Sequence, residues 1–237
     1  MNILMKTWST SSGTKVRQML SGRSNVFLVS TDVSHILIDS GPGFMWKILQ
    51  RRLDDLGISQ IDFLFLTHSH FDHTGNAAKI KETYHSKVII QESESGFLSS
   101  GDNVLPTGTN ALTRFLVNTF ARQFIKFARY RPCTPDITFI EKYDLTDSGC
   151  DSYLIHTPGH TEGSASIIID HEIALVGDTM FGVFPGSVFP PFAGNPGELI
   201  HSWNKLLDTG CNVFIPSHGS ANKRSLVEKA YKKRLSQ

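Results

Sequence analysis

Short apolar runs, separated by Gly, Pro and polar turns, divide most of the chain into strand-sized and helix-sized pieces. These runs predict strands at 25–30, 35–39, 62–66, 87–91, 137–140, 153–156, 164–170, 172–176 and 212–215. Apolar residues at helical spacing predict helices at 45–56, 77–84, 196–208 and 222–235. Groups of strands flanked by helices favour sheets covered by helices in one compact domain.

The segment 92–135 departs from this pattern. Residues 111–130 carry apolar positions at helical spacing, which predicts one long amphipathic helix or two short ones. Between 103 and 135 there is no acidic residue, while the basic residues are Arg114, Arg122, Lys126, Arg129 and Arg131. We therefore expect one domain over 1–237 with a helical insertion at about 92–135. The insertion is either a lid over a site or an amphipathic helix packed on the domain with a solvated basic face.

Composition limits the possible partners. The 237 residues suit one domain with a modest insertion, and 40% hydrophobic content allows a sizeable core. Because 23 Lys and Arg oppose 22 Asp and Glu, no overall basic field favours nucleic acid, and we expect no such partner. Three scattered cysteines and no signal-like or membrane-spanning apolar run predict a cytoplasmic protein without a transmembrane segment. The sequence carries no signal of oligomeric state.

Residues 67–73, Thr-His-Ser-His-Phe-Asp-His, follow a predicted buried strand directly. In an extended segment His68 and His70 point to the same side, because side chains alternate along a strand. Asp72 and His73 come where the chain turns into a helix, so they can face a second point nearby. Imidazole nitrogens and carboxylate oxygens are ligands for zinc and similar divalent metals. This spacing therefore predicts a metal site.

Four further candidate ligands share one setting, a Gly- or Pro-marked loop at the end of a predicted strand. They are His160 in TPGH, Asp178 in GD, His218 in PSHG, and Asp39 before Gly-Pro-Gly. Loops at strand ends are where a rigid sheet can bring side chains together. A lone His or Asp is more often structural, so it is their occurrence together with the first cluster that indicates one shared site.

The motifs HSHFDH, TPGHTEGS, GDTMF and PSHG, in this order, resemble those of the metallo-β-lactamase superfamily. The resemblance extends from the NVFLVS strand to His218, and it implies an α/β (α+β) fold, a four-layer αββα sandwich with metals at one edge of two sheets. It implies a first metal bound by His68, His70 and His160, and a second bound by Asp72, His73 and His218. It further implies that Asp178 bridges the two metals and that Asp39 orients a ligand.

Such a site predicts a dinuclear metal-dependent hydrolase. Two divalent ions, zinc first and iron or manganese as alternatives, lower the pKa of a shared water, and Asp72 orients this nucleophile or takes its proton. Asp178 stands where several true β-lactamases have Cys, which favours the glyoxalase-II-like, lactonase-like and phosphodiesterase-like branches. Only 19 residues follow His218, so we expect no glyoxalase-II C-terminal domain. The expected reaction is cleavage of an ester, thioester, lactone or phosphodiester.

Two features suggest an amphiphilic or anionic small-molecule substrate. Phe181, Phe184, Phe189 and Phe192 follow Asp178 and can form an apolar pocket wall or pack on their own core. Arg122 and Lys126 of the insertion can attract an anion. Three alternatives stay open: an iron-dependent oxidoreductase of the same fold that resembles sulfur dioxygenases, a nuclease-type phosphodiesterase, and a non-catalytic metal-binding protein.

Overall fold

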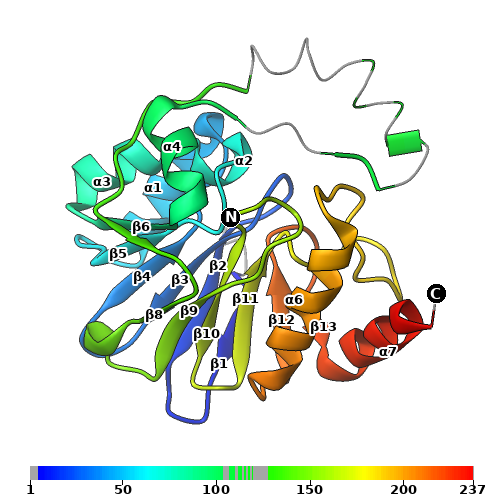
Figure 1. The fold of residues 1–237 in the computed structure, drawn as a ribbon. Helices are drawn as coiled ribbons and strands as arrows, with labels where there is room; N and C mark the ends of the chain where they lie inside the picture. The colour runs from blue at the N-terminus through cyan, green and yellow to red at the C-terminus, as the bar shows by residue number, and fades with distance from the viewer. Residues whose placement is uncertain are drawn as a thin grey trace.

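Two sheets stacked face to face form the centre of the molecule (Figure 1). The structure is a computed structural model, and it describes residues 5–103, 107–109, 112, 113, 115, 117, 119 and 128–236. The seven-stranded sheet contains, in spatial order, β1 (Thr7–Ser9), β2 (Lys15–Leu20), β3 (Val26–Ser30), β4 (His35–Ile38), β5 (Phe63–Phe65), β6 (Lys87–Gln91) and β7 (Ile137–Phe139). The six-stranded sheet runs from β13 (Asn222–Lys223) through β12 (Val213–Pro216), β11 (Ile173–Gly177), β10 (Ala165–Ile169) and β9 (Ser152–His156) to β8 (Lys142–Asp144).

Helices cover the outer faces of both sheets. Figure 1 shows one group on the side of the seven-stranded sheet, which comprises α1 (Trp46–Asp55), α2 (Phe71–Thr74), α3 (Ala77–Tyr84) and α4 (Glu92–Ser100). On the other side are α6 (Pro196–Asp208) and α7 (Arg224–Leu235). Two short 3-10 turns, η1 (Gly43–Met45) and η2 (Thr146–Ser148), complete the named elements. None of the described helices is long and apolar enough to cross a membrane.

Three apolar clusters hold these layers together. Phe27, Phe65 and Ile167 are buried between the two sheets. A second cluster joins α1 and α3 to the seven-stranded sheet, and a third, around Trp203 of α6, covers the six-stranded sheet. Helix–sheet, sheet–sheet and sheet–helix interfaces therefore follow one another, which confirms the predicted αββα sandwich.

The interior strands are apolar on both sides because both faces of each sheet are covered. In β4, Ile36 and Ile38 enter the cluster between the sheets, whereas Leu37 points into the cluster beneath the helices. Predicted and observed bounds agree within two residues for most of these strands, and α3, α6 and β6 have the predicted bounds.

Besides the two-residue β13, three strands were not predicted, β1, β2 and β8. Each carries polar residues and half-exposed positions, so its sequence lacks a continuous apolar run. The chain around 222–235, predicted as one helix, begins with the two residues of β13 before α7. The first part of the expected insertion differs from the prediction. α4 is part of the helical layer on the seven-stranded sheet, and its Leu98 is buried in the core of that layer. Arg122 and Lys126 lie outside the described residues, so the lid remains a prediction.

Candidate metal centre

The predicted ligands meet at one edge of the sandwich. β4 and β5 run parallel, as do β11 and β12, so within each sheet these strands end at the same edge. β9 runs in the same direction as β11, because both are antiparallel to β10. The edge therefore receives the loops that carry the candidate side chains: His68 and His70 after β5, Asp72 and His73 on α2, His160 after β9, Asp178 after β11 and His218 after β12.

Three of these histidines converge on one point. Nδ1 of His70 lies 3.0 Å from Nε2 of His68 and 3.1 Å from Nε2 of His160. All three side chains are buried. Burial lowers the pKa of His68 well below its ordinary value, and it also lowers the pKa of His160. Neutral imidazoles that share one focus are what a divalent cation needs from nitrogen ligands.

A second group lies beside the first. Nε2 of His73 is 3.8 Å from Oδ1 of Asp72 and 3.7 Å from Oδ1 of Asp178. Nε2 of His218 is 3.5 Å from Oδ2 of Asp72 and 3.3 Å from Oδ2 of Asp178. The same oxygen of Asp178 lies 3.5 Å from Nε2 of His160, so Asp178 faces both groups. Each group has its ligand atoms within 4.8 Å of one another.

The donor atoms of this second group fit a cation. His73 Nε2 and Asp178 Oδ1 are buried and make no hydrogen bond among the described residues. Burial opposes charge on His73, yet the surrounding carboxylates, led by Asp39, raise its pKa to about 10. Burial also opposes the ionisation of Asp178, but His218 and His73 hold its pKa well below the ordinary value. The carboxylates therefore favour positive charge at this point, which a bound metal would supply.

Asp39 contacts His73, a member of this group, on the side away from the other ligand atoms. Its carboxylate accepts hydrogen bonds from Thr67 N (2.9 Å) and Ser217 Oγ (2.9 Å), and its Oδ2 lies 2.8 Å from His73 Nδ1. Asp39 is fully buried and has a φ of 59°, a left-handed conformation that is uncommon outside glycine. Because it holds Nδ1, it directs Nε2 of His73 toward Asp72 and Asp178. This arrangement supports the predicted orienting role of Asp39.

Glu94 was missed in the sequence. It lies on α4, is only 1% exposed, and accepts hydrogen bonds from Ser69 N (2.9 Å), from Ser69 Oγ, and from Gly163 N (3.1 Å). Ser69 stands between His68 and His70, and Gly163 belongs to the loop of His160. One buried carboxylate thus joins two ligand loops. The signal in the sequence is an acidic residue shortly after the end of β6, within the segment for which an insertion is predicted.

The four predicted pocket phenylalanines lie in different settings. Phe181 stacks on His218, with ring centroids 4.8 Å apart. Phe192 is half-buried, and its carbonyl oxygen lies 3.0 Å from Nδ1 of His160. Phe189 packs edge-on against Trp203 in the core beneath α6, and Phe184 is exposed. Only the first two therefore lie beside the metal-ligand groups, and their contact with a substrate remains a prediction.

Described parts of the 92–135 segment also lie at this edge. Asn103 Oδ1 accepts a hydrogen bond from the backbone N of Phe71, within the HSHFDH motif. Thr109 N donates to the carbonyl of Pro191 (3.1 Å), and Ala193 N donates to that of Thr107 (2.8 Å). The segment is therefore anchored on both sides of the candidate ligands.

Comparison with known proteins identifies the family. The family model described as the metallo-beta-lactamase superfamily matches residues 21–218. The chain belongs to this superfamily. A probable metallo-hydrolase of Methanocaldococcus jannaschii, MJ0888, is 31% identical over 206 residues, which is 85% of this chain and 90% of that protein.

Solved structures of the superfamily share the fold. The archaeal superfamily protein ST1585 from Sulfolobus tokodaii has a TM-score of 0.66 at 20% identity. The match covers 94% of this chain and 86% of the ST1585 chain. The metallo-β-lactamase MIM-1 from Novosphingobium pentaromativorans has a TM-score of 0.66 at 16% identity, and the match covers 93% of this chain and 87% of that one. At these identities the likeness concerns the αββα architecture alone.

Proposed function

We propose that this superfamily member is a dinuclear metal-dependent hydrolase. The observation that carries the proposal is the pair of ligand groups that share Asp178, one formed by three histidines and the other by Asp72, His73 and His218. Two zinc-type ions bound there would supply a hydroxide nucleophile near neutral pH and stabilise the oxyanion of the reaction.

The chain's own residues hold and orient the reacting groups. Asp72 is partly exposed, with a side-chain exposure of 18%, whereas Asp178 at 5% is nearly enclosed. Asp72 is therefore the carboxylate at the open side of the site, placed to orient the nucleophile and to hold its proton. His218 carries the stacked ring of Phe181 beside it, which provides an apolar surface next to the polar groups.

The proposed substrate is a small ester, thioester, lactone or phosphodiester. A thioester receives support from the similarity to the atrochrysone carboxyl ACP thioesterase of Aspergillus fumigatus, 24% identical over 205 residues. That match covers 86% of this chain and 53% of the fungal protein, so it supports the type of bond rather than the particular substrate. An anionic or amphiphilic substrate would explain a basic segment anchored at this edge.

The test combines metal analysis with a substrate panel. Purified protein is analysed for zinc, iron and manganese and is assayed with thioesters, lactones, phosphodiesters and β-lactams. We expect about two metal ions per chain and hydrolysis of at least one class, with both lost in His68→Ala. The matched control is His201→Ala, which removes an exposed histidine of α6.

Three outcomes would contradict the proposal. One is retention of full activity by His68→Ala, and another is a metal-loaded protein inactive on the whole panel. Dominant iron with oxygen uptake would instead favour the oxidoreductase alternative. A separate test concerns the basic segment. Replacing Arg122 and Lys126 with neutral residues should lower kcat/KM for an anionic substrate but not for a neutral one. If the kcat/KM for the anionic substrate does not change, that part of the proposal is wrong.

A further inference from the structure

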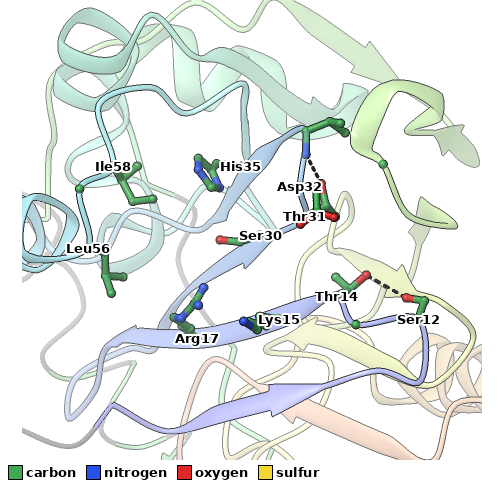
Figure 2. A pocket seen from close by; sticks show the side chains of 14 residues that line it. Ser12, Thr14, Lys15, Arg17, Ser30, Thr31, Asp32, His35, Leu56 and Ile58 are labelled. Atoms are coloured by element: carbon green, nitrogen blue, oxygen red, sulfur yellow. Dashed lines mark hydrogen bonds between the residues drawn. The ribbon is translucent and has the colours of Figure 1, made fainter.

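A hollow lies on the outer face of the seven-stranded sheet, at the opposite end of its strands from the ligand groups. Its volume is about 720 Å³, and Lys15, Arg17, Ser30 and His35 line it together with Leu56 and Ile58 beyond the end of α1 (Figure 2). His35 begins β4, whereas Asp39 follows its last residue. Four residues of extended chain separate the two positions by about 13 Å, so the hollow is separate from the metal centre.

The strand register builds the floor of this hollow. Lys15 of β2 is directly opposite Ser30 of β3, and Ser30 is directly opposite His35 of β4. Side chains of directly opposite residues share one face, with Cβ atoms about 4.5–5.5 Å apart. Arg17 lies two residues beyond Lys15 and therefore points to the same face. Figure 2 shows the side chains of Ser30 and Arg17 directed toward the space enclosed with Leu56 and Ile58.

Two polar atoms of this floor are buried and unpaired. The hydroxyl of Ser30 and Nδ1 of His35 make no hydrogen bond among the described residues. Buried polar atoms in folded proteins nearly always have a partner, so unpaired ones indicate a missing water or ligand. Ser30 and His35 are cross-strand neighbours, so their two unpaired atoms lie close together. This pair of atoms points to a ligand independently of the shape of the hollow.

The charges specify the sign of that ligand. Lys15 and Arg17 pair with no carboxylate in the described part of the chain. The opposing charge is Asp32 on the rim; Asp62, next to His35, accepts hydrogen bonds from Ser34 Oγ and the His35 backbone N. Two unpaired cations beside a hydroxyl and an imidazole form a donor set suited to phosphate oxygens.

The rest of the wall is polar. Ser12, Thr14 and Thr31 line it, and their hydroxyls already take part in hydrogen bonds within the chain: Ser12 Oγ donates to Asp170, Ser12 and Thr14 contact each other, and Thr31 Oγ1 donates to the carbonyl of Ser148. Thr31 Oγ1 also accepts hydrogen bonds from the backbone N of Val33 and Ser34, so its lone pairs are used. The hydroxyl oxygens of Ser12 and Thr14 keep lone pairs for the hydroxyl groups of a ligand. The volume also exceeds that of a single inorganic ion.

We propose that this hollow binds a small phosphorylated sugar or polyol, with the phosphate on Lys15, Arg17, Ser30 and His35. The test is calorimetric titration of the metal-loaded protein with ribose 5-phosphate, ribose and inorganic phosphate. We expect saturable binding of ribose 5-phosphate, weaker binding of inorganic phosphate, and none of ribose. The double variant Lys15→Gln/Arg17→Gln should weaken ribose 5-phosphate binding at least tenfold, whereas Lys229→Gln, an exposed lysine of α7, should leave it unchanged.

Two further variants make the result specific. Ser30→Ala should weaken binding several-fold without changing the thermal unfolding curve. Asp178→Asn, which impairs the metal centre, should leave the binding intact, so failure of the hydrolase proposal would not affect this one. The proposal is overturned by an absence of saturable binding at millimolar ribose 5-phosphate, by equal affinity for inorganic phosphate, or by unchanged binding in the double variant. Loss of binding in Asp178→Asn would also overturn it, because the ligand would then depend on the metal centre.

Discussion

Replacement of Glu94 by Gln tests whether a residue outside the candidate ligand groups controls metal binding. The carboxylate joins Ser69 of the HSHFDH loop to Gly163 of the TPGHTEGS loop through three accepted hydrogen bonds. Glutamine keeps the volume but has one acceptor oxygen instead of two. Whichever way the amide turns, its NH₂ group faces a backbone N–H, either that of Ser69 or that of Gly163.

The magnitude follows from this mismatch. A hydrogen bond to a buried charged group contributes about 1.5–3 kcal/mol, and a buried donor left without an acceptor costs about 1–3 kcal/mol. The two contributions partly describe the same loss and do not simply add. We therefore expect Glu94→Gln to lower the free energy of unfolding by about 2–4 kcal/mol. Because the two loops carry His68, His70 and His160, metal affinity should fall about 10- to 100-fold, as found for residues that position metal ligands.

The assay measures both quantities on the same preparations. Urea unfolding of the metal-free protein gives the stability, and competition with a chromophoric chelator gives the metal affinity. The control is Glu92→Gln, an exposed residue of the same helix, which should change neither. The reasoning is refuted if Glu94→Gln unfolds at the parent urea concentration and binds metal with parent affinity. A loss of stability with unchanged metal affinity would limit Glu94 to a purely structural role.

Further predictions concern the support of the site and the stability of the fold. Asp39→Asn should weaken metal binding about 10- to 100-fold in the chelator assay, because it weakens the acceptor that orients His73; parent affinity would contradict this. Gly75→Ala should cost about 1–3 kcal/mol in urea unfolding, since a Cβ there would lie 2.9 Å from a carbonyl oxygen of the loop after β4. Gly96→Ala, where a Cβ meets nothing within 4 Å, should be neutral or stabilising. Burial opposes ionisation of Asp170, but hydrogen bonds from the hydroxyls of Ser12, Thr10 and Thr14 and from the backbone N of Asp151 hold its pKa below the ordinary 3.8. The contribution of Asp170 to stability is therefore present above about pH 4 and lost as the pH falls further. Asp170→Asn should flatten the acid side of the curve of unfolding free energy against pH. An unchanged curve would argue against this contribution.

Local sequence was sufficient for the strands with a continuous apolar run and for the candidate ligands, but not for β1, β2, β8 and β13. Apolar runs identified the buried strands because strands covered on both faces exclude polar residues, as in β5 and β11. The candidate ligands were recognisable because each follows such a run: His68 after β5, His160 after β9 and His218 after β12. What sequence supplied, therefore, was the identity of these residues and their position at strand ends.

Tertiary structure decided which residues share a site. The shared position of Asp178 between two ligand groups depends on the stacking of the sheets, which spacing along the chain does not encode. Glu94 could not be assigned to the site from the sequence, because the residues that it binds are 25 and 69 positions away along the chain. The row formed by Lys15, Ser30 and His35 likewise depends on strand register, which is determined by pairing across the sheet and not by any one strand. Sequence therefore specified the local elements and the chemistry they carry, whereas long-range packing specified their convergence.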